Sequence, residues 1–301
     1  MHTFWSSANI LFPQWLFQGL EQLRFVSLAQ IGARLIVFAA TFALVRHKED
    51  LRLATALQTL GPLLGGLLAL PQTFKALSLS RMRWPQYSAL RHQLHEGWHV
   101  FLSSAAINIY TSCNAFFLGL LAPASAVGHY HVAEKLIRAV QMMLSPISNA
   151  VYPHVSRLAA ENPQALIQFN RKLLAAMTAC GAIFTVFVLL LAPWGISLLF
   201  GSGYEDATPV LRVMACLPLL VAMSNVLGIQ TMLPLGMKQA FSRVLLVSAV
   251  LDILLFLPAA SLSGALGAAW TNVLVELFVT VAMAWGLHQK GFSLFGRATQ
   301  K

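Results

Sequence analysis

Residues 131–149 carry polar and charged side chains at helical spacing within an apolar part of the sequence. Apart from one methionine, the residues that recur every three or four positions are polar and lie on one helical face: His131, Lys135, Arg138, Met142, Ser145 and Asn149. Glu134 precedes Arg138 by four residues, the favourable order for an ion pair within a helix. Cations attract phosphate, and amides and hydroxyls match the hydroxyl groups of sugars. This face therefore predicts a cavity lined by cations, amides and hydroxyls, or else a polar seam against a neighbouring helix.

Five further polar side chains interrupt apolar stretches, where ionisable groups are costly and are functional hypotheses by default. Arg34 is interpreted as a cation that faces a cavity. Ser104 and Asn108 either line the same cavity or form hydrogen bonds between helices. Asp252 and Glu276 are the deep acids. They either carry protons or ions in a coupled transporter or form structural hydrogen bonds to a neighbouring helix.

The composition excludes several classes of protein. The chain has 301 residues, of which 57% are hydrophobic and only 10% charged, with a formal net charge of +10. Soluble domains are about half apolar and a quarter charged, so this chain has too few charges to cover a soluble globule. Its hydrophobicity excludes a disordered chain, its 3 Cys exclude a disulfide scaffold, and the lack of a polar surface excludes a nucleic-acid binder. The remaining class is an all-α polytopic membrane protein.

Eight stretches are long and apolar enough for transmembrane helices, since about 20 apolar residues cross a bilayer. They are residues 26–45, 52–72, 99–121, 126–152, 173–194, 209–234, 241–260 and 264–287. Turn-forming or charged segments separate them at 46–50, 122–125, 201–206 and 261–264. Strands of a membrane barrel would be shorter, about 10 residues, and would alternate apolar with polar side chains. The pattern therefore predicts helices.

The Lys and Arg residues between these stretches predict their orientation, because cytoplasmic loops are enriched in them. One set of loops holds twelve: Lys75, Arg81, Arg83, Arg91, Arg157, Arg171, Lys172, Lys238, Arg243, Lys290, Arg297 and Lys301. The intervening loops hold three. The first set is therefore expected to be cytoplasmic, together with both termini. The longest loop is expected over 73–98, and residues 1–25 are interpreted as an aromatic-rich interfacial segment.

The loops are too short to form a catalytic domain. This favours a transporter over a membrane-embedded glycan enzyme such as a polymerase or an acyltransferase. No Cys pair has metal-ligand spacing, and His92, His95 and His99, at helical spacing, are interpreted as membrane-surface residues rather than as a metal site. We expect no catalytic residue, no metal and no cofactor.

Four segments stand in a characteristic order: 12–21 (FPQWLFQGLE), 127–135 (VGHYHVAEK), 145–153 (SPISNAVYP) and 199–204 (LFGSGY), the last followed by VLR at 210–212. Together they resemble motifs of the bacterial polysaccharide repeat-unit flippases of the O-antigen type. That family belongs to the multidrug/oligosaccharidyl-lipid/polysaccharide exporter superfamily. The similarity extends over essentially the whole chain.

The resemblance implies a fold of twelve helices in two lobes of six around a central cavity. The eight stretches then correspond to helices five to twelve, and the chain is expected to be truncated at its amino end. Residues 1–25 would be the interfacial cytoplasmic segment and the tail of a preceding helix, 26–97 the remainder of the first lobe with the cytoplasmic inter-lobe loop, 98–288 the complete second lobe, and 289–301 a basic cytoplasmic tail.

The resemblance also implies a function, the translocation of undecaprenyl-diphosphate-linked oligosaccharide across the bacterial inner membrane by alternating access. The expected substrate-binding residues are Arg34, Ser104, Asn108, His131, Lys135 and Arg138. The cations among them would attract the diphosphate or acidic sugars, and the hydroxyl and amide groups would contact the glycan. Asp252 or Glu276 would couple transport to ions.

The expected partners are the lipid-linked oligosaccharide, membrane lipid, and the polysaccharide polymerase and chain-length machinery, with no nucleic acid. A lipid II flippase and a drug/cation antiporter of the same superfamily are the alternatives, although a drug exporter would more often carry anionic cavity groups. A non-functional truncated remnant is a further alternative.

Overall fold

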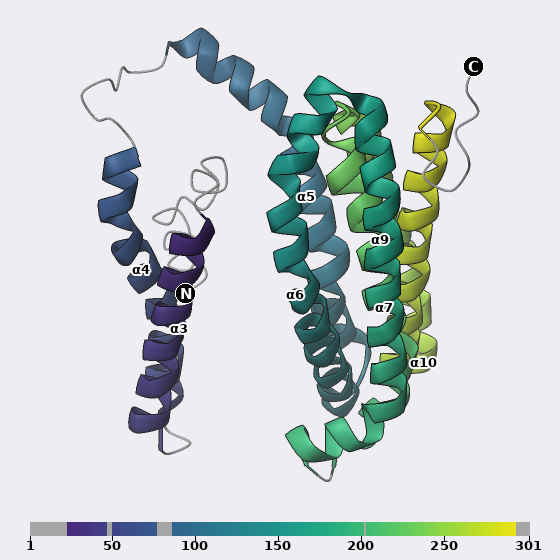
Figure 1. Ribbon diagram of the computed structural model, residues 1–301. Helices are drawn as coiled ribbons and strands as arrows, with labels where there is room; N and C mark the ends of the chain where they lie inside the picture. The colour runs from purple at the N-terminus through teal and green to yellow at the C-terminus, as the bar shows by residue number, and fades with distance from the viewer. Residues whose placement is uncertain (1–22, 47–49, 77–85, 202, 293–301) are drawn as a thin grey trace. The chain divides into compact units, whose positions relative to one another are not determined.

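The computed structural model describes residues 23–46, 50–76, 86–201 and 203–292. All regular secondary structure in these ranges is helical, which confirms the all-α prediction. The chain divides into two compact units, Met1–Gln86 and Tyr87–Lys301. Each unit is described by itself (Figure 1).

The first unit contains two long helices that pack against each other, α3 (Leu23–Leu44) and α4 (Leu51–Ala76). Ala33 of α3 is 2% exposed. Its Cβ atom lies 3.8 Å from the position that a Cβ atom on Gly65 of α4 would take. Small residues at a contact let two helices approach closely, as is common in membranes.

The second unit is a bundle of long helices that run alongside one another (Figure 1). The helices are α5 (Tyr87–Leu121), α6 (Ala124–Glu161), α7 (Pro163–Phe200), α8 (Ala207–Met214), α9 (Leu217–Leu227), the π-helical turn η3 (Gly228–Met232) and α10 (Lys238–Gln289).

Local sequence accounts for the junction between α6 and α7. Only Asn162 separates the two helices, and its side-chain oxygen accepts hydrogen bonds from the backbone N–H groups of Gln164 and Ala165, at 3.0 and 3.1 Å. Pro163 occupies the first turn of α7, where no intrahelical partner exists for an N–H group and proline is favoured. The chain therefore stops one helix and starts the next within a single residue.

α10 bends sharply at Gly264, which has φ 54° and ψ −127°. Only glycine adopts such backbone angles without strain. The two arms of α10, residues 238–263 and 265–289, meet closely beyond the bend. A Cβ atom on Gly267 would lie 1.9 Å from the carbonyl oxygen of Ala259, so no larger residue fits at this position.

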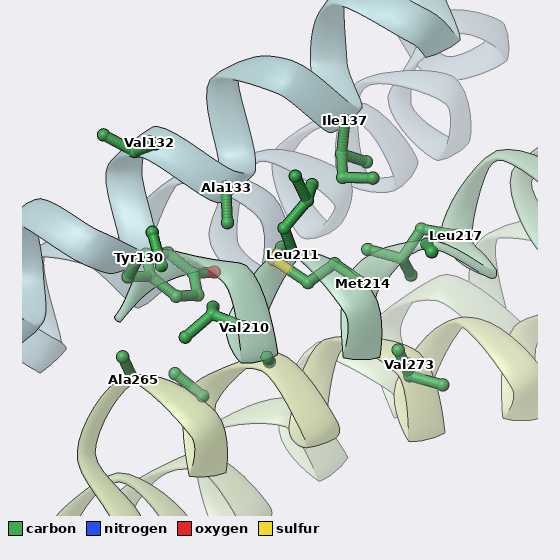
Figure 2. Close-up of a cluster of buried hydrophobic side chains, with 14 of the residues drawn as sticks. Tyr130, Val132, Ala133, Ile137, Val210, Leu211, Met214, Leu217, Ala265 and Val273 are labelled. Atoms are coloured by element: carbon green, nitrogen blue, oxygen red, sulfur yellow. The ribbon is translucent and has the colours of Figure 1, made fainter. Parts of the chain in front are cut away.

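Figure 2 shows buried side chains of α6, α8 and α10 that meet in the second unit. Tyr130 and Ala133 of α6 are fully buried, as are Leu211 and Met214 of α8, and all four belong to one apolar cluster with Val273 of α10. Within a membrane the close packing of such side chains stabilises the contact through van der Waals attraction. The cluster fixes which face of α6 is turned inward and, in consequence, which face is turned outward.

The structure agrees with the predicted breaks. The segment 122–125 contains the junction of α5 and α6, 201–206 separates α7 from α8, and 261–264 ends at the bend of α10. Three helical stretches of the described residues are long and apolar enough to cross a membrane: Pro163–Phe200, Ala207–Met232 and Lys238–Gln289. The total of eight spans stays a prediction.

The connection expected over 73–98 is partly helical, and its role as a loop between spans stays a prediction. α4 continues to Ala76, and α5 begins at Tyr87, so the second half of the expected loop is helical. Leu90, Leu94 and Trp98 recur every four residues, which is a helical period. Charged residues and histidines lie between these three apolar residues, and they make the stretch too polar to be predicted as a membrane span.

We expect Gly267→Ala to destabilise the second unit by roughly 1–3 kcal/mol, the usual cost of forcing extra atoms into a packed site. The added methyl group would meet the backbone of Ala259, which moves less readily than a side chain. Thermal unfolding of the purified protein in detergent measures the effect. Gly286→Ala is the matched control, since the nearest atom to its Cβ position is 3.9 Å away, on Met232. Equal unfolding temperatures for the two variants would contradict the close contact.

Candidate functional site

The second unit contains a pocket of about 310 Å³ between α5, α6, α8, α9, η3 and α10. Most of its wall is apolar, with side chains such as Ile137, Val221 and Met283. Its polar lining residues are Glu134, Arg138, Gln141, Ser224, Asn225, Asn272 and Glu276. Among the residues that line it, Arg138 is the one cation and Glu134 and Glu276 are the acids. The pocket thus brings two predicted site residues, Arg138 and Glu276, to one place.

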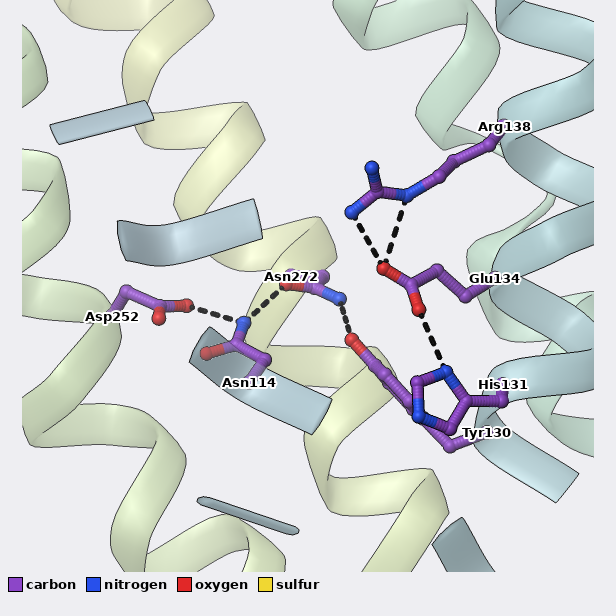
Figure 3. Close-up of polar contacts among 7 residues, drawn as sticks. All are labelled: Asn114, Tyr130, His131, Glu134, Arg138, Asp252 and Asn272. Atoms are coloured by element: carbon purple, nitrogen blue, oxygen red, sulfur yellow. Dashed lines mark hydrogen bonds and ion pairs between the residues drawn. The ribbon is translucent and has the colours of Figure 1, made fainter. Parts of the chain in front are cut away.

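Three side chains of α6 form an ionic cluster beside this pocket (Figure 3). The Nε and Nη2 atoms of Arg138 both donate to Oε1 of Glu134, at 3.1 and 2.7 Å. The other carboxylate oxygen of Glu134 lies 3.3 Å from Nδ1 of His131. The expected ion pair between Glu134 and Arg138 is therefore confirmed. Glu134 is 14% exposed, whereas Arg138 and His131 are each 49% exposed.

The whole polar face of α6 is turned away from the core of the second unit. All its members are exposed: His131, Lys135, Arg138, Met142, Ser145 and Asn149. The opposite face, with Tyr130, Ala133 and Ile137, is buried. The seam alternative is therefore wrong for the helices of this unit, because a seam between them would bury the polar face.

A second network joins α5, α6 and both arms of α10 inside the unit (Figure 3). The side-chain amide of Asn114 donates to Oδ1 of Asp252 at 3.2 Å and to Oδ1 of Asn272 at 2.7 Å. The amide of Asn272 in turn donates to the hydroxyl oxygen of Tyr130 at 2.6 Å. Asp252 is 1% exposed and does not line the pocket, whereas Asn272 does. Hydrogen bonds therefore connect the pocket wall to the buried carboxylate.

Glu276 has a separate partner. It is 6% exposed, and its Oε1 atom accepts a hydrogen bond from the hydroxyl of Ser224 in α9 at 2.6 Å. Both residues line the pocket. Asp252 and Glu276 therefore lie in the same unit, and each accepts a hydrogen bond from a neighbouring helix. Such bonds are also expected if the two acids have only a structural role.

The other predicted residues lie outside these networks. Asn108 of α5 is exposed, and its amide donates to the carbonyl oxygen of Ser104 at 2.9 Å. The adjacent Ile107 lines the pocket. Lys135 is exposed on α6. Arg34 is exposed on α3, in the first unit. The roles of all four in binding stay predictions.

A third polar cluster surrounds the π-helical turn. The amide of Asn170 in α7 donates to the carbonyl oxygen of Gln230 and to the hydroxyl oxygen of Thr231, at 2.8 and 3.0 Å. The side-chain amide of Gln230 donates to the carbonyl oxygen of Ser148 in α6 at 2.9 Å. Isolated π-helical turns are frequent at functional sites, but here the cluster ties three helices together.

Sequence reasoning missed Asn114, Tyr130 and Ser224 as members of these networks. Asn114 and Ser224 are polar residues within apolar stretches, a signal that was available. Tyr130 belongs to the segment 127–135 and directly precedes the polar face of α6. Nothing in the sequence indicated that its hydroxyl group points into the core.

Comparison with known proteins identifies the family. A family model described as "Polysaccharide biosynthesis protein" matches residues 2–159, more than half of the chain. The chain belongs to this family. The matched part includes the cluster of His131, Glu134 and Arg138 and the buried Asn114. The predicted membership of a polysaccharide-related family is thereby confirmed.

Two curated proteins that are similar to this chain are named "Putative O-antigen transporter". The relative from Escherichia coli (strain K12) is 32% identical over 276 residues, which cover 92% of this chain and 66% of the relative. The relative from Shigella dysenteriae is 29% identical over 280 residues, which cover 92% of this chain and 70% of the relative. No solved structure matches the chain.

We expect Tyr130→Phe to destabilise this family member by about 1 kcal/mol, because the amide of Asn272 loses its buried acceptor. The ring keeps its packing, so the change isolates the hydroxyl group. Thermal unfolding in detergent measures the effect. Tyr152→Phe on the same helix is the control, since its side chain lies at a less buried position. A Tyr130→Phe protein as stable as the wild type would show that the bond contributes nothing.

Proposed function

We propose that this protein translocates lipid-linked polysaccharide repeat units of the O-antigen type across the bacterial inner membrane, as a transporter and not as an enzyme. The observation that carries the proposal is the exposed polar face of α6, with Arg138 on the wall of the adjoining pocket. The names of the two relatives support it. The substrate class that fits is an undecaprenyl-diphosphate-linked oligosaccharide, which combines a diphosphate with a glycan.

The position of the polar face supports a binding role. Lipid cannot solvate a row of charged side chains, because polar groups in the hydrocarbon region are satisfied by protein or by a water-filled cavity. This face is not buried by the helices of its own unit. It is therefore directed to a cavity in which Lys135 and Arg138 meet the diphosphate or acidic sugars, His131 lies beside them, and Ser104 and Asn108 contact the glycan. Arg34, in the first unit, is a further proposed substrate-binding cation.

The proposed architecture is the two-lobe fold of the polysaccharide flippases that the sequence motifs resemble. The eight stretches are helices five to twelve of a two-lobe transporter that works by alternating access, with both termini on the cytoplasmic side. Residues 98–288 form the complete second lobe, and 26–97 belong to the first lobe and the inter-lobe loop. The two compact units divide at Gln86 and Tyr87, before this proposed boundary. Polymerase and chain-length machinery are the proposed partners.

We expect Lys135→Glu and Arg138→Glu each to abolish surface polysaccharide in cells that depend on this protein, without loss of expression. A reversed charge repels the anionic substrate at the polar face. Immunoblots of the protein and of surface polysaccharide measure the two quantities. Arg243→Glu is the control, because Arg243 is also an exposed cation, on α10, and does not line the pocket. Normal polysaccharide in both α6 variants would exclude the proposed cavity.

Asp252 and Glu276 are the proposed ion-coupling residues. Both are buried carboxylates with side-chain hydrogen bonds to a neighbouring helix. A carboxylate inside a membrane bundle is costly unless it is paired, and such groups commonly belong to ion or proton pathways. Asn114 bridges Asp252 to Asn272 at the pocket wall, so a change in the charge of Asp252 alters the hydrogen bonds there.

We expect Asp252→Asn to fold and to lose the response of transport to an imposed ion gradient. The replacement keeps an oxygen that accepts from Asn114 but removes the charge. Glu276→Gln tests the other acid in the same way. Uptake of lipid-linked oligosaccharide into proteoliposomes, with and without a sodium or proton gradient, is the measurement. Asp206→Asn, at an exposed acid, is the control. A full gradient response in both buried-acid variants would exclude these residues as coupling groups.

A further inference from the structure

Glu134 occupies the position in which Arg138 would bind an anion. Both donor atoms of Arg138 that face Glu134 converge on one carboxylate oxygen, at 3.1 and 2.7 Å. A carboxylate and a phosphate offer an arginine the same kind of oxygen acceptors, and charge-assisted bonds to either are short and strong. The guanidinium group is therefore already engaged by an internal anion in the structure.

The same carboxylate also contacts the second basic residue of the cluster. Its other oxygen lies 3.3 Å from Nδ1 of His131, a contact that becomes an ion pair when the imidazole is protonated. Glu134 is more buried than either partner, so it is held between them and the helix surface. The other acid of the pocket, Glu276, accepts from Ser224 instead. Glu134 is thus the acid that balances the basic side chains of α6.

We infer that Glu134 is an internal counter-ion that competes with the anionic group of the substrate for Arg138 and so limits how tightly the substrate binds. This inference rests on the proposed function of Arg138. When an anion enters, Arg138 and His131 exchange the carboxylate for it, and when the anion leaves, the carboxylate returns. Because the competitor is attached to the same helix one turn away, its effective concentration is high.

The arrangement suits a transporter, which has to release what it binds. An arginine without this counter-ion would hold a diphosphate more tightly, because charge-assisted bonds between a guanidinium group and phosphate oxygens are strong. The carboxylate of Glu134 offsets part of the attraction between Arg138 and the anion, so that the anion can both bind and leave. Glu134 is therefore a residue that sets affinity without being a substrate ligand itself.

The test measures how tightly inorganic pyrophosphate binds to the purified 301-residue chain in nanodiscs. Binding is monitored by phosphorus NMR during a titration at low ionic strength. We expect Glu134→Gln to bind about five-fold tighter than the wild type, the effect of removing one like charge about 4 Å from a bound anion in water. Glu134→Asp keeps the charge but is too short to retain both bonds to Arg138, and we expect a smaller gain. Circular dichroism confirms that each variant is folded.

Two comparisons separate this inference from a general effect of charge. Glu161→Gln removes an exposed acid from the same helix and is expected to leave the affinity unchanged. In an Arg138→Gln background, Glu134→Gln is expected to give no gain. Equal gains in the Glu161 variant, a gain that persists without Arg138, or no gain in the Glu134 variants would each overturn the inference.

The proposed function fails in a different way. If Arg138→Gln and Lys135→Gln bind pyrophosphate as well as the wild type, the polar face is not the anion site, and the proposal for the whole protein loses its basis. If Arg138→Gln weakens binding while Glu134→Gln leaves it unchanged, the anion site stands and only the counter-ion inference falls.

Discussion

The second unit depends on the side-chain amide of Asn114, which donates to Asp252 on one arm of α10 and to Asn272 on the other. Asn114 and Asp252 are each 1% exposed, and a carboxylate buried in this way without a partner would cost several kcal/mol. One residue of α5 therefore holds both arms of the bent α10 in register. Because Asn272 then donates to Tyr130, the same interaction also fixes the rotation of α6.

Two adjacent residues of α6 belong to the interior of the unit and to its polar surface, respectively. Tyr130 is directed into the core and ends the chain of hydrogen bonds that starts at Asp252, while His131 is directed outward and begins the ionic cluster with Glu134 and Arg138. A rotation of α6 about its axis would break the first network and redirect the second. A change in the hydrogen bonds of Asp252 can therefore move the exposed cations, because Tyr130, which ends that network, lies on the same rigid helix as His131 and Arg138.

Periodicity and composition predicted the parts of this structure that local sequence determines. The all-α fold, the breaks between helices, the polar face of α6 and the pair of Glu134 with Arg138 all depend on residues a few positions apart. The role of Asn114 does not, since its partners lie 138 and 158 residues away in the chain. A single sequence gives no register between distant helices. The helical start of α5 was missed for another reason, since its period was present but its polarity was that of a loop.

The charges of the polar face do not act as isolated cations. Glu134 neutralises one positive charge of the cluster, so the attraction of the face for an anion is smaller than its count of basic residues indicates. A cationic drug would gain little from a carboxylate that an arginine already holds, whereas an anion gains the arginine whenever the carboxylate moves aside. The paired arrangement therefore discriminates between anions and cations less strongly than the number of basic residues indicates, and it favours a ligand whose own oxygens replace those of the carboxylate.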